Sequence, residues 1–410
     1  MTSTVSRPPA LWPLLLCWVI VALDGFDLVV LGTVIPTLLS TKELGFDPAA
    51  ATAVATAGLV GVGIGALTVG PLADRHGRRL CLVVCVTVFS VLTLAIAVAP
   101  NVFVFGLLRV LAGLALGACL PVTIAYVTDL MPSARAGKAT TLTMTGYHAG
   151  AVLTALLAIA VIPDWRVLFL IGGAAGLVVV PLIRFLLPEA RRERDAAPRA
   201  TVRQLVARPY LTISVGVWVA SFMGLLVVYG LNTWMPQLMK DAGYGSTDAL
   251  GLLLTLNAGA VTGLVLAGVV ADRAGTKRVA MAWFVLAAAL LAFLSIRLED
   301  VTMVYVAVFV TGVFVFSAQV LVYAFITQLY PPEVRSTALG FAAGIGRLGA
   351  ILGPAVTGTL VSLGLAYPGG FYVFAATALL AVGALAVIPA RAPAAVATPQ
   401  PAAAEVDVAG

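Results

Sequence analysis

The chain has 410 residues, of which 61% are hydrophobic and 10% are charged, and its formal net charge is +6. A soluble domain has roughly 45–50% apolar and about 25% charged residues, so a soluble enzyme or a nucleic-acid-binding module is excluded for the bulk of the chain. At ~20 residues per crossing, the length fits a bundle of transmembrane helices, and we predict an all-α polytopic membrane protein.

Twelve apolar stretches are long enough to cross a bilayer, and together they divide the chain into two halves. They cover 11–39, 48–72, 80–99, 101–124, 139–163, 165–187, 210–238, 247–271, 278–298, 301–330, 336–364 and 367–390. The composition between and after them predicts four parts. These are an N-terminal six-helix half over 1–187, a charged linker over 188–209, a C-terminal six-helix half over 210–390 and a disordered tail over 391–410.

The Lys and Arg residues are unevenly distributed over the predicted loops. Eighteen of the 24 lie on the side of the two termini and the linker, four lie on the other side, and two lie within spans. Because cytoplasmic loops carry an excess of Lys and Arg, we expect a multi-pass protein of the cell (inner or plasma) membrane. Both termini, and with them the tail, are then cytoplasmic.

The first span contains two carboxylates, Asp24 and Asp27. Their spacing of three residues places them on one helix face, roughly 20 and 24 Å along the helix from Leu11. A carboxylate at mid-bilayer costs ~2.5–3.5 kcal/mol, so we interpret the pair as a proton site. Arg109 of the fourth span lies at a comparable depth, and a cation there competes with a proton for the carboxylate. The alternative is a permanently ionised, structural pair with Arg109.

A polar motif follows the second span and returns in a degenerate form after the eighth, and related loops follow the fourth and tenth spans. The residues concerned are Gly70, Asp74, Arg75, Gly77, Arg78, Arg79, Asp129, Arg135, Asp272, Arg273 and Arg335. A parallel repeat of two six-helix halves is a transporter architecture with the substrate cavity between the halves. We expect these residues to form a cytoplasmic gate. For Arg78 and Arg79, decoration of the cytoplasmic surface is the alternative.

Arg347 lies near the middle of the eleventh span, which has no acidic residue of its own. A guanidinium binds a carboxylate through two parallel N–H groups, so we predict that Arg347 holds a carboxylate substrate. Pairing with Asp24 across the bundle is the alternative. His148, at the same depth of the fifth span, is either an anion ligand or a satisfied core residue.

Aromatic and amide side chains complete the predicted substrate site, because aromatic rings can stack on an aromatic substrate. They are Tyr147, Asn232, Trp234 and Tyr323, with Tyr229, Asn257 and Gln319 as further polar-tipped candidates. For Trp234, anchoring at the membrane interface is the alternative.

The motifs also carry a family resemblance. Residues 70–79 match the Gly-x-Leu-Ala-Asp-Arg-x-Gly-Arg-Arg loop of the major facilitator superfamily, and 268–278 is its weaker copy. The segments 24–28, 231–236 and 346–351 resemble the aromatic acid:proton symporter family. The resemblance covers the chain from residue 12 to about residue 388. It implies the twelve-helix major facilitator fold and import of an aromatic carboxylate with protons by alternating access.

The resemblance also bears on individual residues and on the substrate. It associates Arg109 with proton coupling, and Asp129 stands where the family more often has Glu. Benzoate, hydroxybenzoates, vanillate and gentisate all fit the family. Few hydrogen-bond donors besides Arg347, His148 and the tyrosines are available for ring hydroxyls, which favours benzoate.

Other functions remain open at this point. One alternative is a proton-driven multidrug exporter of the same fold, which would tend to lack Arg347. Another is a sugar or organic-anion carrier of this fold. A sugar carrier would need neutral hydrogen-bonding side chains in place of Arg347. A membrane enzyme would need a metal set or a nucleophile–base pair, whereas the chain has two His and no Ser/Cys–His spacing that stands out. We therefore expect no enzymatic activity, no catalytic or metal-ligating residue and no cofactor. The expected partners are the aromatic acid, protons and the lipid bilayer, with no nucleic acid, for a protein that functions as a monomer.

Overall fold

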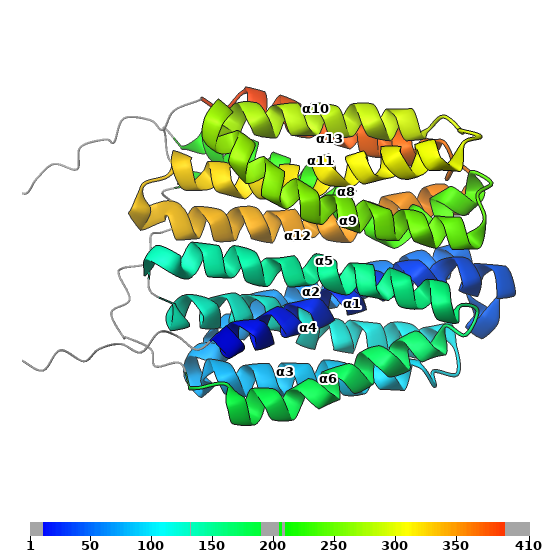
Figure 1. The fold of residues 1–410 in the computed structure, drawn as a ribbon, viewed down its shortest axis with the longest axis horizontal. Helices are drawn as coiled ribbons and strands as arrows, with labels where there is room; N and C mark the ends of the chain where they lie inside the picture. Colours follow the sequence, from blue (N-terminus) through cyan, green and yellow to red (C-terminus); the bar gives the residue numbers. More distant parts are fainter. Residues whose placement is uncertain (1–10, 132, 190–204, 207–209, 390–410) are drawn as a thin grey trace, which may run out of the picture.

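The computed structural model describes residues 11–131, 133–189, 205–206 and 210–389, and Figure 1 shows their helices in two groups that lie side by side. The first group contains α1 (Leu11–Thr41), the short η1 (Glu43–Gly45), α2 (Pro48–His76), α3 (Arg78–Ile96), α4 (Val102–Leu130), α5 (Ser133–Val161) and α6 (Arg166–Leu186). The second contains α8 (Leu211–Asp241), α9 (Ser246–Ala274), α10 (Thr276–Leu294), α11 (Val301–Leu329), α12 (Pro332–Ser362) and α13 (Gly369–Ala386). Twelve of these helices are long and apolar enough to cross a membrane, and the described residues form no strand. The predicted all-α fold with twelve spans is confirmed. Most of the predicted linker, the ten residues before Leu11 and the whole predicted tail lie outside the described residues.

Two helices extend furthest past the apolar stretches that predicted them. α4 continues to Leu130 and α5 already begins at Ser133, whereas the predicted spans end at residue 124 and begin at residue 139. The extended backbone of Met131 (φ −100°, ψ 143°) ends α4. Hydropathy predicts which part of a helix contacts lipid. The helix itself can continue beyond that part, for as long as its backbone hydrogen bonds are formed. The sequence therefore placed these two ends too close to the apolar core.

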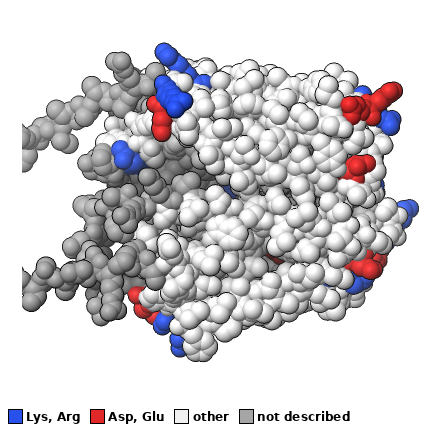
Figure 2. Space-filling view, in the orientation of Figure 1, with Lys and Arg blue, Asp and Glu red and all other residues white. Residues whose placement is uncertain are grey.

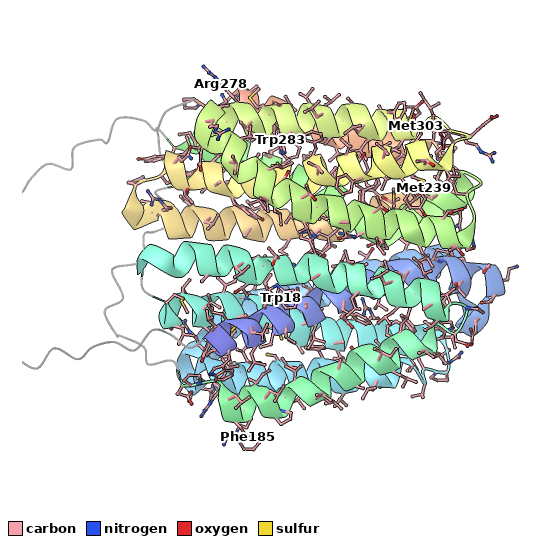
Figure 3. All side chains as sticks on the ribbon, in the orientation of Figure 1. Trp18, Phe185, Met239, Arg278, Trp283 and Met303 are labelled. Atoms are coloured by element: carbon pink, nitrogen blue, oxygen red, sulfur yellow. The ribbon has the colours of Figure 1, made fainter. Side chains whose placement is uncertain are left out.

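The surface of the bundle fits a bilayer. On the face drawn in Figure 2, acidic and basic side chains gather at the two ends of the long axis, and a broad belt without charges lies between them. Large apolar side chains are exposed on the flanks, among them Phe185, which points away from α6 in Figure 3 and is 78% exposed. Helices satisfy their own backbone groups and can therefore present such side chains to hydrocarbon. The chain is a multi-pass membrane protein.

Helix length separates an inner set of helices from an outer set. α3, α6, α10 and α13 have 18 to 21 residues, whereas the other eight spans have 29 to 31. α3 and α6 pack on each other at one flank, and α10 and α13 pack on each other at the other flank. The long helices carry the contacts between the two groups, which include α2 with α12, α5 with α9 and α1 with α8.

Glycine lets the long helices of each group touch through their backbones. A Cβ atom on Gly65 of α2 would lie 2.0 Å from the carbonyl oxygen of Leu114 in α4. In the second group, a Cβ atom on Gly263 of α9 would lie 2.1 Å from the carbonyl oxygen of Val313 in α11. Small residues permit this close packing of transmembrane helices. The two groups therefore use the same kind of contact at matching places.

The two helix groups are joined at one end of the bundle. We call the end with the start of α1 and the finish of α13 the terminal face, and the other end the opposite face. The hydrophobic cluster toward the opposite face includes residues of both groups, whereas toward the terminal face each group has its own cluster. The contacts toward the opposite face include Lys240 Nζ, which donates to the carbonyl oxygen of Pro36 (3.4 Å). Nearby, a Cβ atom on Gly32 would lie 2.3 Å from the carbonyl oxygen of Asn232.

An acidic residue of η1 ties the first group together at the opposite face. Glu43 accepts hydrogen bonds from Trp165 Nε1 (2.8 Å) and from Arg166 Nη1 (2.5 Å). The Trp165 hydrogen bond lowers the pKa of Glu43 below its ordinary value of 4.5; burial opposes this effect, and the hydrogen bond and charge of Arg166 add to it. Because the folded-state pKa is the lower one, the stabilisation is complete above the unfolded-state pKa and is lost as the pH falls through the folded-state value.

We expect Glu43→Gln to lower the free energy of unfolding at pH 7 by about 1 kcal/mol or less, since the group is partly solvated. The difference from the unmodified protein should shrink as the pH is lowered through about 4.5. Thermal unfolding of the purified protein in detergent at several pH values measures both effects. Glu299→Gln, which changes an exposed carboxylate, is the matched control. A difference that grows toward acid pH would contradict the assignment.

Candidate functional site

The predicted proton pair contains one fully partnered carboxylate. Arg109 of α4 donates from Nη1 to Asp27 Oδ2 (2.9 Å) and from Nη2 to the Asp27 carbonyl oxygen (3.1 Å). Thr93 of α3 donates to Asp27 Oδ1 (3.0 Å). Asp27 and Arg109 are 3% and 6% exposed. The structure thus brings together the two residues that the sequence placed at the same depth, and it adds a hydroxyl from α3.

Asp24, one turn earlier on α1, has a different environment. It is buried, yet no hydrogen bond or ion pair to it is found among the described residues. Its strongest electrostatic interactions with charged groups are with Arg347 of α12 and with Asp27. A buried ionised carboxylate without a close partner is costly. Of the two carboxylates of α1, Asp24 is therefore the one with less compensation for a negative charge.

Arg347 lies on the wall of an apolar cavity that opens to the surface of the bundle, where the lining residues Leu67 and Leu348 are 76% and 56% exposed. The cavity has a volume of about 660 Å³ and is bounded by α2, α4 and α12, with Ile64, Leu67, Pro121 and Ile351 among its lining residues. Arg347 Nη1 donates to the Tyr229 hydroxyl (3.2 Å), and no acidic side chain pairs with it among the residues described. A guanidinium has five N–H groups. Arg347 thus retains donors for an anion beside an apolar surface.

His148 is held in the contact between the two groups. Its Nδ1 lies 3.4 Å from Asn257 Oδ1 of α9, and its ring packs edge-on against Tyr147 and Phe316, with centroids 5.2 and 5.1 Å apart. Asn257 in turn donates to Asn232 Oδ1 (3.0 Å). These contacts agree with the alternative of a core histidine with its own partner. The Tyr147 hydroxyl is buried and has no hydrogen-bond partner within the described part of the chain.

The remaining substrate candidates fall into two places. Tyr323 lies near Arg347, with which it interacts electrostatically, and its hydroxyl accepts a hydrogen bond from Ser221 (3.5 Å). Trp234 is completely buried in the cluster shared by both groups, and its Nε1 donates to the Pro354 carbonyl oxygen (3.0 Å). Trp234 does not line the Arg347 cavity, and its complete burial does not fit an anchor at the membrane interface.

The motif residues at the terminal face form contacts within the first group. Arg78 forms an ion pair with Asp129 and a hydrogen bond to the Ala125 carbonyl oxygen. Arg79 pairs with Glu189 (2.7 Å). The ion pairs found among the described residues all lie within the first group. Arg78 and Arg79 therefore connect the start of α3 to its neighbours and are more than surface decoration.

Other members of the predicted gate have no contact across the groups in the part that the structure describes. Arg75, Asp272 and Arg273 are exposed, and Arg335 donates to the Tyr330 carbonyl oxygen (3.4 Å). Nothing is described of the side chains of Asp74 and Arg135 or of the surroundings of Gly70. A lock between the two groups stays a prediction.

The backbone conformation at position 77 requires glycine. Its φ of 90° and ψ of 146° form the turn between α2 and α3, and a Cβ atom there would lie 2.8 Å from Glu189 Oε1. Gly275 repeats this conformation between α9 and α10 (φ 89°, ψ 130°), with no atom within 4 Å of a Cβ. Such backbone conformations cost ~1–3 kcal/mol for other residues.

We expect Gly77→Ala to lower both thermal stability and the maximal transport rate, with little change in substrate affinity. Gly275→Ala introduces the same backbone strain without displacing Glu189, so it should have the smaller effect. Thermal unfolding, together with initial uptake rates at several substrate concentrations, measures both. A weakened binding constant with an unchanged maximal rate in the Gly77 variant would contradict this expectation.

Sequence reasoning missed two hydroxyls of the site. Thr93 completes the shell of Asp27, and Ser221 bonds Tyr323 and accepts from Gln319 Nε2 (3.2 Å). A single Thr or Ser in an apolar helix gives no signal, because many of them bond only their own backbone, as Thr123 does. Tyr229, which bonds Arg347, was a secondary candidate on the sequence.

The chain resembles known transporters in sequence. Residues 17–265 and 244–408 match the family model described as Major Facilitator Superfamily. The chain is 36% identical to the gentisate transporter of Corynebacterium glutamicum, an alignment that covers 91% of this chain and 86% of that protein. It is 32% identical to the benzoate transport protein of Acinetobacter baylyi, over 90% of this chain and 86% of that protein. These relatives confirm the resemblance drawn from the motifs and the expectation of a transporter rather than an enzyme.

A solved structure resembles the whole fold. The structure described as a D-xylose-proton symporter matches 93% of this chain and 99% of its own chain, with a TM-score of 0.76. At 16% sequence identity, this similarity concerns the arrangement of the helices and carries no statement about substrate.

Proposed function

The chain belongs to the Major Facilitator Superfamily, and from this premise we propose that it imports an aromatic carboxylate of the benzoate or hydroxybenzoate type together with protons. One observation carries the proposal most directly. Arg347 offers free guanidinium N–H groups on the wall of an apolar cavity. An aromatic acid needs both parts of this wall, a cation for its carboxylate and an apolar surface for its ring.

The chemistry of Arg347 matches a planar carboxylate. Its guanidinium can donate two parallel hydrogen bonds to the two carboxylate oxygens. The tyrosines that interact with it electrostatically, Tyr147, Tyr229 and Tyr323, offer aromatic faces and hydroxyls to a ring. Gentisate and benzoate, the substrates in the names of the two relatives, both have a carboxylate attached directly to an aromatic ring.

The carboxylates of α1 support proton coupling. Asp27 is held by Arg109, and a proton on Asp27 would compete with that guanidinium. Asp24 interacts electrostatically both with Arg347 and with Asp27, a member of this pair. In this proposal, protonation of the α1 carboxylates is linked to the charge of Arg347, which binds the substrate.

The transport cycle follows from how the groups meet. In this proposal, the halves 1–187 and 210–390 move as two bodies joined by the linker 188–209, and the protein works as a monomer. The terminal face is cytoplasmic, since the Lys and Arg excess lies there. The shared cluster then closes the outer side while each half keeps its own cluster on the inner side. This arrangement corresponds to an inward-facing step of alternating access.

Uptake by the purified protein in proteoliposomes tests the proposal. Labelled benzoate should accumulate when an inward proton gradient is imposed, and a protonophore should abolish the accumulation. Unlabelled gentisate and 4-hydroxybenzoate should compete, whereas xylose should not. Accumulation that the protonophore leaves unchanged would refute proton coupling, and competition by the sugar but by no aromatic acid would refute the substrate class.

A further inference from the structure

A second, much smaller cavity lies between the proton pair and the second half. It has a volume of about 20 Å³ and is lined by residues of α1, α2, α4 and α8, among them Asp27, Gly58, Arg109, Tyr229 and Asn232. A single water molecule needs roughly 10–15 Å³ and two to four polar partners. We propose that this cavity binds one water molecule and that this water connects Asp27 to the Tyr229–Arg347 pair.

Two of the lining groups are donors that the described residues leave without a partner. Arg109 Nε and Asn232 Nδ2 are buried atoms with no hydrogen bond in the described part of the chain. Their side chains belong to residues that are 6% and 3% exposed. A buried donor without a partner costs ~1–3 kcal/mol. A polar ligand between them therefore relieves two penalties at once.

Besides the Thr233 hydroxyl, two further polar lining groups have oxygens that can accept a hydrogen bond. Asp27 contributes its carboxylate, whose oxygens each have a second lone pair beside the bonds from Arg109 and Thr93. Tyr229 contributes its hydroxyl oxygen, which already accepts from Arg347 and has a second lone pair. Water accepts two hydrogen bonds and donates two. It therefore matches two donors and two acceptors, whereas an anion or a cation would match only half of them.

The orientation of Asn232 is fixed from the far side. Asn257 Nδ2 donates to Asn232 Oδ1 (3.0 Å) and to the Leu253 carbonyl oxygen (3.1 Å). Asn257 Oδ1 lies against His148 Nδ1 (3.4 Å). Since the oxygen of Asn232 is engaged by Asn257, its NH₂ group is the one that remains for the cavity. His148 and Asn257 thus act as positioning residues for the water site.

The water gives the two halves a way to sense protonation, an inference that rests on the proposed proton coupling. Ionised Asp27 accepts a hydrogen bond from the water. Protonated Asp27 donates instead, and because the water accepts at most two hydrogen bonds, it must release one of its two other donors, Arg109 Nε or Asn232 Nδ2. The water that bonds Tyr229, and through it Arg347, is therefore rearranged when Asp27 changes its protonation state. Asp24 and Arg347, the nearby charges on α1 and α12, interact with the same region.

Gly58→Ala tests the site with the smallest possible change. A Cβ atom on Gly58 would lie 3.7 Å from Arg109 Cβ and 3.9 Å from Arg109 Nε, which are ordinary contact distances. The added methyl group therefore fits the fold but occupies space beside the unpartnered Nε. We expect proton-driven accumulation of benzoate to fall about tenfold or more, the factor expected for one hydrogen bond to a charged group. Proton-independent exchange and benzoate affinity should stay within about twofold. Gly383→Ala, in open space on α13, is the matched control.

Radiolytic hydroxyl labelling detects the water itself, because a bound water labels the side chains around it. Tyr229 should be labelled in the unmodified protein and protected in Gly58→Ala. Equal labelling of Tyr229 in the two proteins would overturn the water site. Loss of labelling with normal proton-driven accumulation would overturn its coupling role. Tyr229→Phe removes the acceptor oxygen and should likewise lose accumulation; full accumulation in this variant would also overturn the coupling role. If the unmodified protein shows no proton-driven uptake, the proposed function fails, and the labelling still decides the water site.

Discussion

Asp27→Asn is expected to abolish benzoate accumulation driven by an imposed pH gradient, while carrier-mediated exchange of benzoate persists. The asparagine amide can still accept a hydrogen bond from Arg109, but it cannot bind and release the proton. Uptake and counterflow by the same proteoliposomes measure the two activities. Asp24→Asn is expected to act in the same direction. The contrast between the two variants should identify which carboxylate carries the proton, since only Asp27 is held by Arg109 and Thr93.

Folding must be separated from coupling in this experiment. Removing one charge of a buried pair leaves the other uncompensated, which costs ~3–5 kcal/mol. The double variant Asp27→Asn/Arg109→Gln removes both charges and should recover thermal stability without recovering accumulation. Asp164→Asn, at an exposed carboxylate, should leave accumulation intact. Normal gradient-driven accumulation by a stable Asp27→Asn protein would eliminate Asp27 as the proton site.

Arg347→Lys is expected to weaken the binding of benzoate by about one to two orders of magnitude although the charge is retained. A guanidinium donates two parallel hydrogen bonds and presents a flat face to a ring, whereas an ammonium is a point charge on a flexible stem. Loss of one charge-assisted hydrogen bond, at ~1.5–3 kcal/mol, corresponds to this change in affinity. Isothermal titration calorimetry on the purified protein measures the binding constant.

Arg184→Lys provides the matched control, because Arg184 is exposed at the end of α6. Its benzoate affinity should equal that of the unmodified protein. Arg347→Lys also changes the bond to Tyr229, so the thermal stability of each variant has to be compared first. An Arg347→Lys protein that is stable and binds benzoate with unchanged affinity would show that Arg347 is not the carboxylate ligand, and His148 would become the next candidate.

Hydrophobic patterning predicted the helices of this protein better than their contacts. Twelve apolar stretches were sufficient to predict the twelve spans, because each helix forms its own backbone hydrogen bonds and each contacts the same lipid environment. Depth along the helices also placed Asp27 and Arg109 at the same level, and they pair. The ends of α4 and α5 were predicted wrongly, because those ends lie outside the apolar region.

The rotation of each helix about its own axis could not be predicted from the sequence. Whether Trp234 faces the Arg347 cavity or the cluster shared by the two halves depends on how α8 packs against α12, and the structure places it in the cluster. The same applies to Tyr229, whose partner Arg347 is 118 residues away in the chain. Spacing within one helix cannot report such a contact.

The four short helices on the flanks determine the bilayer thickness that matches the hydrophobic length of this protein. At 1.5 Å per residue, helices of 18 to 21 residues are about 27–32 Å long, close to the ~30 Å of a bilayer's hydrocarbon core. The inner helices, with 29 to 31 residues, are longer than that layer is thick. Lipid chain length therefore acts first on α3, α6, α10 and α13. A bilayer thicker than these helices would have to thin around the flanks or tilt them, so each half has a lipid boundary of its own.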